Sequence, residues 1–466
     1  MRFVHLCVAI ALATALTAKE PPATWRLDFY HTGGLGTEIF SLDRVVVEPL
    51  PWPGHPDGAL DLSESGDYRY SVRDLDGTVR FSRGFSSIFA EWESSAAALE
   101  RHRTFHESLR FPAPADTVHV IVEKRIPGTG FREVWRYRLD PADPFIERAA
   151  PAPQAVLPIV RNGDPADHLD ILFLGDGYTA EENDDAFAED ARRMAATLFA
   201  FEPFRGYREA INIWGICPPS PASGISRPST GIHLASPIGA TYDAFGSERY
   251  ILTFENRRWR EIAAWAPYEF VVILVNNETY GGGGIFNLYA TVAVKNPVAD
   301  YLFIHEFGHH FAGLADEYYI SPTAYLPPDT IHEPWMANAT ALLDPEKLKW
   351  KDLVTADTPI PTPWPQEAFD AHGRAIQQRR EQIRAENRPE EEMSALFAEQ
   401  AAWETALLSE AEYAGRVGAF SGANYDAKAY YRPEIDCVMF SRNAVPFCAV
   451  CERAMRRVIE RSLPGR

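Results

Sequence analysis

The sequence predicts an α+β protein: an all-β N-terminal domain is followed by a larger domain in which strands and helices alternate. Three observations support this prediction. Short β-rich runs separated by Gly, Pro and Asp turns fill the first 140 residues or so, a pattern typical of a β-sandwich-like domain. Further along, apolar runs alternate with helical segments, which indicates a sheet covered by helices. A stretch at about 366–408, dense in Glu, Arg, Gln and Ala, predicts a charged helical insertion, arranged as a hairpin with a solvated face.

The N-terminus is typical of an export signal. Met1-Arg2 precedes an apolar run from Phe3 to Leu16, with small residues at its end. We therefore expect residues 1–18 to be a signal peptide and the mature protein to be secreted or periplasmic. No later stretch is apolar for 18 residues, so no membrane partner is expected after the signal is removed.

Residues 24–140 form the predicted β-sandwich-like accessory domain. Its expected strands are Trp25–Tyr30, Arg44–Glu48, Tyr68–Val72, Thr117–Glu123 and Val134–Leu139. This region contains no cluster of titratable residues, which favours an accessory or substrate-positioning role. Residues 141–158, with Ala-Ala-Pro-Ala-Pro in their middle, are predicted to be a semi-rigid linker.

The second domain is expected to cover residues 159–466. The apolar run Ile171–Leu174 ends in Gly-Asp-Gly, as in a buried strand followed by a tight turn. Thr179 and Glu182 can form a capping box for a helix running to about Phe201. Ile211–Ile216 and Phe270–Val275 are the next predicted strands, and a final helix is expected from about Val450 to Arg461.

The most informative motif is His305-Glu306-x-x-His309. Asn296 and Pro297 can start a helix here and Gly313 can end it. Residues four apart share one helix face, so both imidazoles can hold one Zn²⁺ while Glu306 polarises a water as general base. With the strand–helix alternation before it, the motif predicts a zincin-type zinc metallopeptidase domain. The alternative is a surface helix that happens to carry histidines.

A catalytic zinc needs a third protein ligand. Asp316 follows Gly313 by three residues, as the third ligand does in metzincins, but one extra residue separates His309 from the glycine. Asp316 is therefore the favoured third ligand, and Glu317 is the alternative.

The stretch before the motif contains four consecutive glycines after Tyr280, which suggest a flexible approach. Asn287–Val294 alternates like an edge strand, so a protein or peptide substrate could bind as an added strand along 285–294. A hairpin without any ligand role is the alternative.

Charge and cysteine content narrow the possible functions. The net charge of −20 argues against nucleic-acid partners. Beyond Cys7 the chain has Cys217, Cys437, Cys448 and Cys451. In an oxidising compartment disulfides are favoured over a zinc knuckle, and the pairing stays open.

Several stretches together resemble the bacterial metallopeptidases named for cleaving immunoglobulin A, a metzincin-like group. The resemblance rests on Leu172–Tyr178, the His305–Tyr318 segment, Gly418–Ala423, Tyr431-Arg-Pro433 and the Cys437-x-Met439…Phe447-Cys-x-x-Cys451 stretch. It implies zinc peptidase activity, with His305 and His309 as ligands and Glu306 as base. It also implies that Met439 forms a methionine turn beneath the metal; otherwise Met439 is an ordinary core residue.

The function predicted from the sequence is a secreted zinc endopeptidase that uses a promoted water. Oxyanion stabilisation is expected from a tyrosine, with Tyr318, Tyr319, Tyr430 and Tyr431 all candidates by position. The alternatives are a non-catalytic adhesion protein on a zincin fold and a zinc amidohydrolase acting on non-protein substrates.

Overall fold

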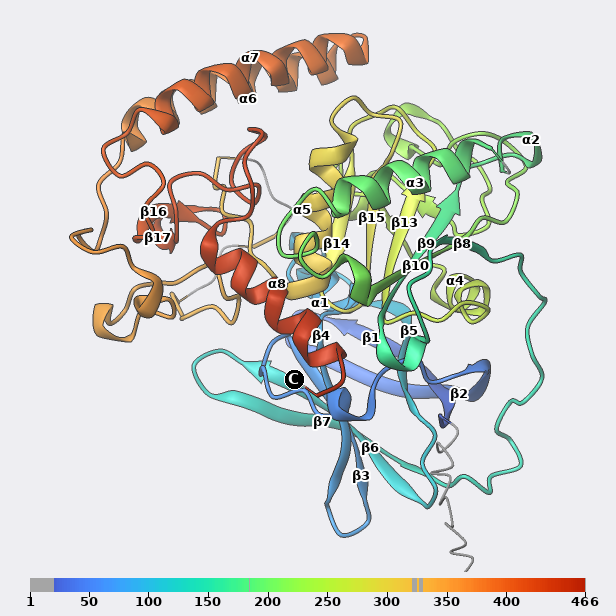
Figure 1. Ribbon diagram of the computed structural model, residues 1–466. Coiled ribbons are helices and arrows are strands. Elements are labelled where there is room, and N and C mark those ends of the chain that lie inside the picture. Colours follow the sequence, from blue (N-terminus) through green and yellow to red (C-terminus); the bar gives the residue numbers. More distant parts are fainter. Residues whose placement is uncertain (1–20, 184, 321–324, 327–329, 466) are drawn as a thin grey trace, which may run out of the picture.

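The computed structural model describes residues 21–183, 185–320, 325–326 and 330–465. The predicted signal peptide, residues 1–18, lies outside these ranges. The chain folds into an N-terminal β region and a mixed α+β region packed on it, at the bottom and top of Figure 1 respectively. Within the described ranges, no helix has both the length and the apolar character needed to cross a membrane.

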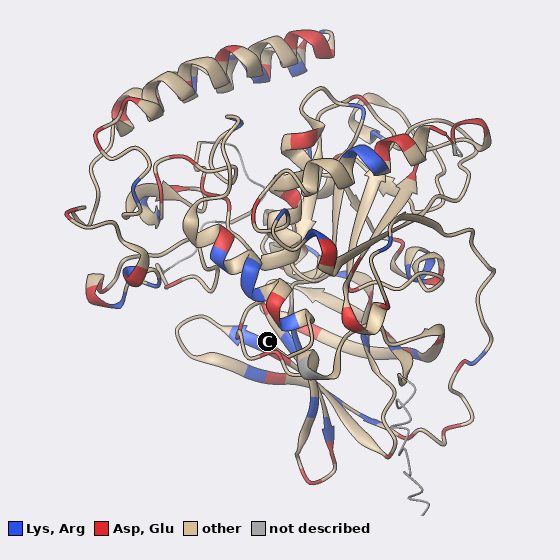
Figure 2. Ribbon diagram, viewed as in Figure 1, with Lys and Arg blue, Asp and Glu red and all other residues tan. Residues whose placement is uncertain are grey.

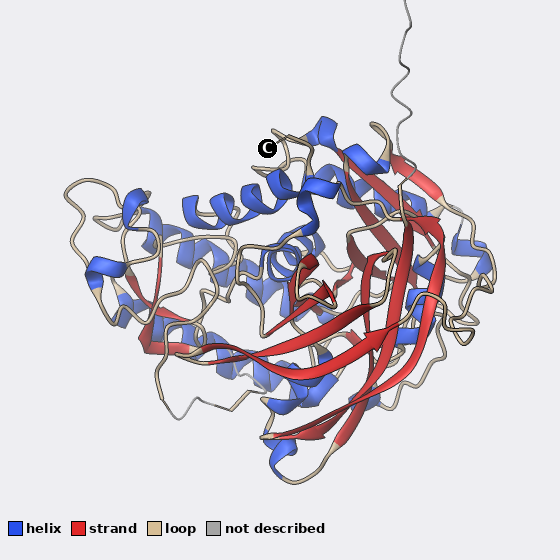
Figure 3. Cartoon of the chain, turned by 90° about the horizontal axis from the view of Figure 1, so that it is seen from below, coloured by secondary structure: helices blue, strands red, loops and turns tan. Residues whose placement is uncertain are grey.

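The N-terminal region consists of two antiparallel sheets with strand orders β2-β1-β5 and β4-β3-β6-β7. Its strands are β1 (Ala23–Gly34), β2 (Thr37–Pro51), β3 (Tyr68–Asp74), β4 (Val79–Phe85), β5 (Arg103–Pro112), β6 (Val118–Ile126) and β7 (Gly130–Leu139). Inward-facing residues of both sheets, such as Phe29 and Val120, share one core. Figure 3 shows the long, twisted strands of this region from below. Strands β4 and β5 were not predicted from the sequence, because their buried positions are not apolar throughout: they include Ser82 and Gly84 in β4 and Glu107 in β5.

The second region is built on a six-stranded sheet in the order β14-β15-β13-β9-β10-β8. Its strands are β8 (Leu157–Val160), β9 (Leu169–Asp176), β10 (Ile211–Ile216), β13 (Phe270–Val275), β14 (Gly282–Ile285) and β15 (Tyr289–Ala293). The four inner strands run parallel and the two edge strands antiparallel to their neighbours. The predicted strands Ile211–Ile216 and Phe270–Val275 are confirmed with the same bounds. A two-stranded ribbon, β11 (Ala240–Thr241) and β12 (Leu252–Thr253), lies outside the sheet.

Helices cover both faces of this sheet. They are α2 (Ala180–Asn183), α3 (Ala186–Leu198), α4 (Asn256–Ala263) and α5 (Ala299–Ala312). α3 and α5 share one core with the sheet, whereas α4 packs on the other face. The single helix predicted from Thr179 to about Phe201 is two helices; Glu182 Oε2 accepts a hydrogen bond from the N–H of Thr179 at 2.8 Å, so this predicted cap serves the short α2.

The C-terminal part adds a helical pair, a hairpin and a last helix. They are α6 (Gln366–Ala385), α7 (Glu390–Ser409), β16 (Phe420–Ala423), β17 (Asp426–Arg432) and α8 (Ala449–Ser462). A short helix, α1 (Ile88–Glu93), belongs to the N-terminal region. α6 and α7 lie side by side at the top of Figure 1 and carry many charges in Figure 2. An exposed ion pair, Arg379–Glu399, joins them at 2.5 Å.

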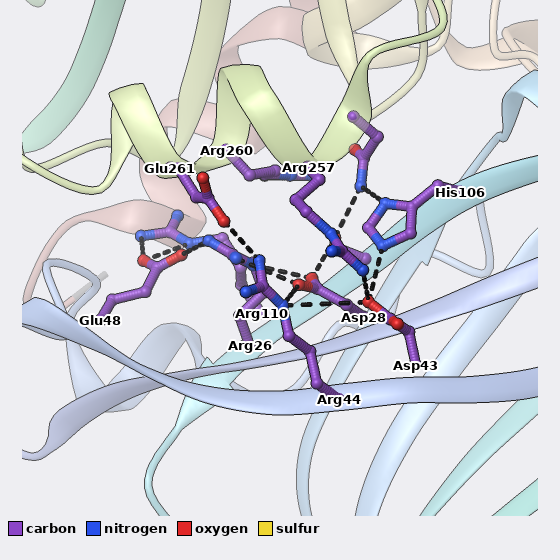
Figure 4. A network of polar contacts seen from close by, with 12 residues as sticks. Arg26, Asp28, Asp43, Arg44, Glu48, His106, Arg110, Arg257, Arg260 and Glu261 are labelled. Atoms are coloured by element: carbon purple, nitrogen blue, oxygen red, sulfur yellow. Dashed lines mark hydrogen bonds and ion pairs between the residues drawn. The ribbon is translucent and has the colours of Figure 1, made fainter. Parts of the chain in front are cut away.

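A network of ion pairs fastens the N-terminal sheet β2-β1-β5 to α4 (Figure 4). Arg44 contacts Glu261 at 2.6 Å across the interface, and Arg257 pairs with Asp43. Beneath them, fully buried Arg26 pairs with Asp28 at 2.7 Å. Arg26 and Asp28 both belong to β1, so this buried pair stabilises the sheet itself. The two pairs that cross the interface are partly exposed and contribute little free energy each. They mark where the N-terminal region packs on α4, although residues 141–156 between the regions contain neither helix nor strand.

Candidate metal centre

Helix α5 places the predicted histidines one turn apart on the same side. It begins at Ala299, slightly later than predicted; Asn296 lies before it, with its Oδ1 accepting the N–H of Val298 at 3.1 Å. The helix ends where predicted: Gly313 is left-handed, with φ +60°, and its N–H donates to the carbonyl of His309 at 3.0 Å.

Three side chains predicted from the sequence converge at this point. Nε2 of His305 lies 3.0 Å and Nε2 of His309 lies 3.2 Å from Oδ1 of Asp316. The two Nε2 atoms are 3.2 Å apart. Each residue thus directs one donor atom at a common point, as ligands of a single ion do.

The opposite ring nitrogens define the tautomers. Nδ1 of His305 lies 3.0 Å from the carbonyl of Val438, and Nδ1 of His309 lies 2.6 Å from the carbonyl of Leu314. Since a carbonyl can only accept, each Nδ1 carries a proton, and each Nε2 is the nitrogen that would offer its lone pair to a bound metal. Two lone pairs and a carboxylate facing one another fit a cation, and these carbonyls orient the rings for it.

The structure distinguishes the two acidic candidates. Asp316 joins the histidines, whereas the alternative ligand Glu317 turns its carboxylate the other way, 3.2 Å from Sγ of Cys451. The chain turns from α5 toward Asp316 at Gly313, where the carbonyl of Gly308 accepts the N–H of Leu314 at 3.3 Å.

Asp316 is held by a residue that sequence reasoning missed. The hydroxyl of Tyr425 donates to Oδ2 of Asp316, the oxygen turned away from His305. Asn424 and Tyr425 form the two-residue turn between β16 and β17, with φ of +48° and +63°. A tyrosine in the left-handed region is strained, and such strain collects at functional sites. Only a Gly at this position would have been an obvious turn signal.

A second tyrosine and an arginine flank the centre. The ring of Tyr318 lies parallel to that of His305, at 5.9 Å between centroids, and Nη2 of Arg249 donates to its hydroxyl at 3.2 Å. Tyr319 instead donates to Asp370 at 2.7 Å. Of the four candidate tyrosines, Tyr318 is therefore the one stacked on a proposed ligand. Arg249 stands in a loop between short elements, and no local pattern marks it.

The remaining two candidates lie on β17. Tyr430 belongs to a small cluster with Ala341 and Ala423, and the backbone of Tyr431 is bonded to Thr340.

Glu306 faces a cleft between the two regions. The cleft has a volume of about 1130 Å³ and is lined by Glu306, His309, Asp316 and the β14 glycines on one side, and by Glu91 and Arg125 of the N-terminal region on the other. Burial raises the pKa of Glu306 above its usual value, and the nearby His305 and His309 oppose this shift. A carboxylate with a raised pKa is a better proton acceptor, as a general base requires.

The four glycines are not a flexible approach. Three of them form the edge strand β14, which passes directly over α5. A Cβ at Gly284 would lie 2.2 Å from the carbonyl oxygen of Glu306 and 2.8 Å from Cβ of His309. Glycine is needed here because the strand approaches the helix too closely for a side chain.

The prediction of a free edge along 285–294 is wrong. β15 lies between β13 and β14, so both of its edges are paired. The edge belongs to β14, and Gly282 already exchanges hydrogen bonds there with Arg249 and Ile251. The alternation in the sequence identified a strand but could not show how many neighbours it has.

Met439 lies under α5. Its Sδ would be 2.8 Å from a Cβ at Gly308, the residue just before His309, and its side chain is fully buried. Its carbonyl accepts the N–H of Glu317 at 2.9 Å.

The four described cysteines are free thiols, so the disulfides predicted from the sequence are absent from this structure. Cys217 lies apart, while Cys437, Cys448 and Cys451 meet Glu317. Three thiols and a carboxylate in one pocket could not be inferred from cysteine spacing alone.

His310, beside His309, links two strands of the sheet through hydrogen bonds. Its Nε2 accepts the N–H of Val271 at 3.2 Å and its Nδ1 donates to the carbonyl of Ile285 at 3.1 Å. Burial lowers the pKa of His310 to about 3, so it stays neutral and links two strands.

Glu306, His309 and Asp316 thus line one wall of the cleft, and Nε2 of His305 reaches Oδ1 of Asp316 at 3.0 Å. The family described as IgA Peptidase M64 matches residues 157–459, and the one described as Peptidase M64 N-terminus matches residues 19–136. The chain therefore belongs to the IgA peptidase M64 family and is a peptidase. No curated protein matches it.

Proposed function

We propose that the protein is a zinc-dependent endopeptidase whose centre is formed by His305, His309 and Asp316, with Glu306 as general base. The observation that supports it best is the convergence of three donor atoms beside Glu306 in a large cleft. Three protein donors leave one coordination position open, as in catalytic zinc sites. The helix-covered sheet with α5 packed against it suits a zincin-type domain.

The chemistry divides between the metal and the protein. Bound zinc would supply Lewis acidity, making water acidic and polarising a carbonyl. Glu306 takes the proton from the attacking water and delivers it to the leaving amine nitrogen. Tyr318, hydrogen-bonded by Arg249, is placed to donate its hydroxyl proton in a hydrogen bond to the carbonyl oxygen as charge develops there.

The cleft favours a protein substrate over a small amide. Its walls come from both regions and its volume is about 1130 Å³, larger than most sites for small ligands. A substrate segment would lie beside β14 and α1, so the N-terminal region takes part in binding. Export, expected from residues 1–18, would bring such an enzyme to extracellular or periplasmic proteins.

The test is Glu306→Gln in the full chain, assayed on casein and on small amides, with zinc content measured. We expect casein hydrolysis to fall by about 10²–10⁴-fold while zinc content is unchanged. Casein hydrolysis at the wild-type rate would exclude Glu306 as the base. Hydrolysis of small amides without any proteolysis would favour the amidohydrolase alternative, and binding of protein without turnover would favour an adhesion protein.

A further inference from the structure

Behind the His305 centre lies a second cluster of donor atoms, composed of Glu317, Cys437, Cys448 and Cys451. It is sealed from solvent, since none of the four is more than 3% exposed. Oε1 of Glu317 is 3.2 Å from Sγ of Cys451 and 3.8 Å from Sγ of Cys448, and Sγ of Cys437 is 4.0 Å from Sγ of Cys451.

These three separations lie close to the edges of a tetrahedron around one zinc ion. Zn–S bonds of about 2.3 Å and Zn–O bonds of about 2.0–2.2 Å give edges of roughly 3.5–3.8 Å. All pairs among the four donor atoms lie within 4.8 Å. Sγ of Cys437 and Sγ of Cys451, at 4.0 Å, are too far apart for an S–S bond of about 2.05 Å.

The carboxylate in this pocket has no cationic partner among the described residues. Oε1 of Glu317 accepts a hydrogen bond from Nδ2 of Asn338 at 2.9 Å, whereas Oε2 is buried with no hydrogen-bond partner. An unpartnered buried carboxylate oxygen is costly. The group Asp28, Asp43 and His106 differs, because arginines already neutralise it (Figure 4).

Backbone N–H groups point at two of the sulfur atoms and would stabilise them as metal-bound thiolates. Sγ of Cys437 accepts the N–H groups of Cys448 at 3.2 Å and Met439 at 3.5 Å. Sγ of Cys448, the N-cap of α8, accepts the N–H of Cys451 at 3.4 Å. Backbone N–H groups and a helix N-terminus stabilise negative charge on sulfur.

We propose that Glu317, Cys437, Cys448 and Cys451 bind a second zinc ion with a structural role. Thiolates select soft or borderline metals, and a closed set of four ligands leaves no position for a reacting water. Binding releases the thiol protons and gives the Glu317 carboxylate the cation that it lacks.

This ion would fix the floor of the open centre. Glu317 adjoins Asp316, and its N–H donates to the carbonyl of Met439, two residues after Cys437. Cys448 and Cys451 lie at the start of α8, so the ion would also connect this helix to Glu317 and Cys437. The second zinc is thus a positioning element for Asp316 and Met439, and takes no part in the reaction itself.

The first test counts metal ions in the full chain purified without chelators. We expect about two zinc ions per chain in the wild type and about one in the His305→Ala/His309→Ala variant. In that variant, a mercurial thiol reagent should release the remaining zinc in step with cysteine modification. Cys217→Ser is the matched control, because this cysteine lies outside the cluster, and it should keep about two ions.

The second test uses Co²⁺ in place of zinc. Its absorption spectrum reports sulfur ligands while Cys451 and the other cluster cysteines stay intact, so the outcome does not depend on a poorly folding Cys451→Ser variant. Co²⁺ bound to the His305→Ala/His309→Ala variant should give a thiolate-to-cobalt charge-transfer band. Absence of that band, or of the remaining zinc, would overturn the proposal. So would a native disulfide between any two of Cys437, Cys448 and Cys451, found by peptide mapping.

Discussion

Two donor clusters lie back to back in this protein, and neighbouring residues serve them: Asp316 faces His305 and His309, whereas Glu317 faces the cysteines. The first cluster opens into a cleft and the second is sealed. The first has three donors, two of them imidazole, and the second has four, three of them sulfur. Donor number and access to solvent separate a site that can do chemistry from one that can only hold the fold.

The largest expected difference between the clusters is their response to chelation. Brief treatment with 1,10-phenanthroline should remove the metal of the open centre and lower casein hydrolysis by about 10³-fold or more. The sealed ion should stay, so the thermal midpoint should change little. Zinc analysis after desalting, with activity restored by added Zn²⁺, checks both parts. Full casein hydrolysis by a zinc-free chain would contradict the catalytic role proposed for the open centre.

Exchanging each acid for its amide should separate the two roles. Asp316→Asn is expected to lower kcat/KM by about 10²-fold or more, because it weakens a ligand of the open centre. Glu317→Gln should act mainly on the fold and lower the free energy of unfolding by about 1–3 kcal/mol. Kinetics and urea denaturation of both variants measure this crossed pattern. Equal effects of the two substitutions on both quantities would refute it.

A smaller effect is expected from Tyr425→Phe, which removes the hydroxyl bonded to Asp316. Loss of such a supporting hydrogen bond typically costs about 10–100-fold in metal affinity or activity. Tyr431→Phe, on the same hairpin, is the control and should resemble the wild type. Zinc affinity measured with a competing chelator dye checks the difference, and unchanged affinity in Tyr425→Phe would show that the hydroxyl has no role.

The smallest effect concerns Glu91, on the N-terminal side of the cleft. Burial raises the pKa of Glu91 to about 7, although the hydroxyls of Tyr325 and Tyr250 oppose the shift. Between about pH 4.5 and pH 7 the folded chain therefore binds more protons than the unfolded chain, so the free energy of unfolding falls as pH rises. Glu91→Gln should remove this part of the pH dependence, about 1 kcal/mol after allowance for partial exposure. Parallel pH profiles in the two proteins would contradict the assignment.

Much of the candidate site could be predicted from the sequence because its parts are local. The helix end at Gly313 and the spacing of His305 and His309 depend on neighbouring residues alone. The same holds for the buried strand Phe270–Val275, which its continuous apolar run identifies. Predictions were weaker for the pairing of strands: the alternation in 285–294 indicated a strand, yet both edges of β15 are paired.

The N-terminal region illustrates the same limit. Its strands β4 and β5 were not predicted, because they bury polar residues such as Glu107, and Arg110 of β5 contacts the second region. Arg249 and Tyr425 reach the centre from loops that carry no sequence signal. The linker and accessory-domain predictions could not show that Arg44 and Asp43 of the N-terminal region pair with Glu261 and Arg257 of α4.

The sequence by itself determined the helix that carries His305, Glu306 and His309, since positions four apart in a helix share a face whatever surrounds them. Only the tertiary structure decided between Asp316 and Glu317, and brought Glu317 to Cys451, 134 positions away. The physical reason is that backbone periodicity is set by near neighbours, whereas the direction of a carboxylate after a helix end depends on which donors the folded chain brings to either side.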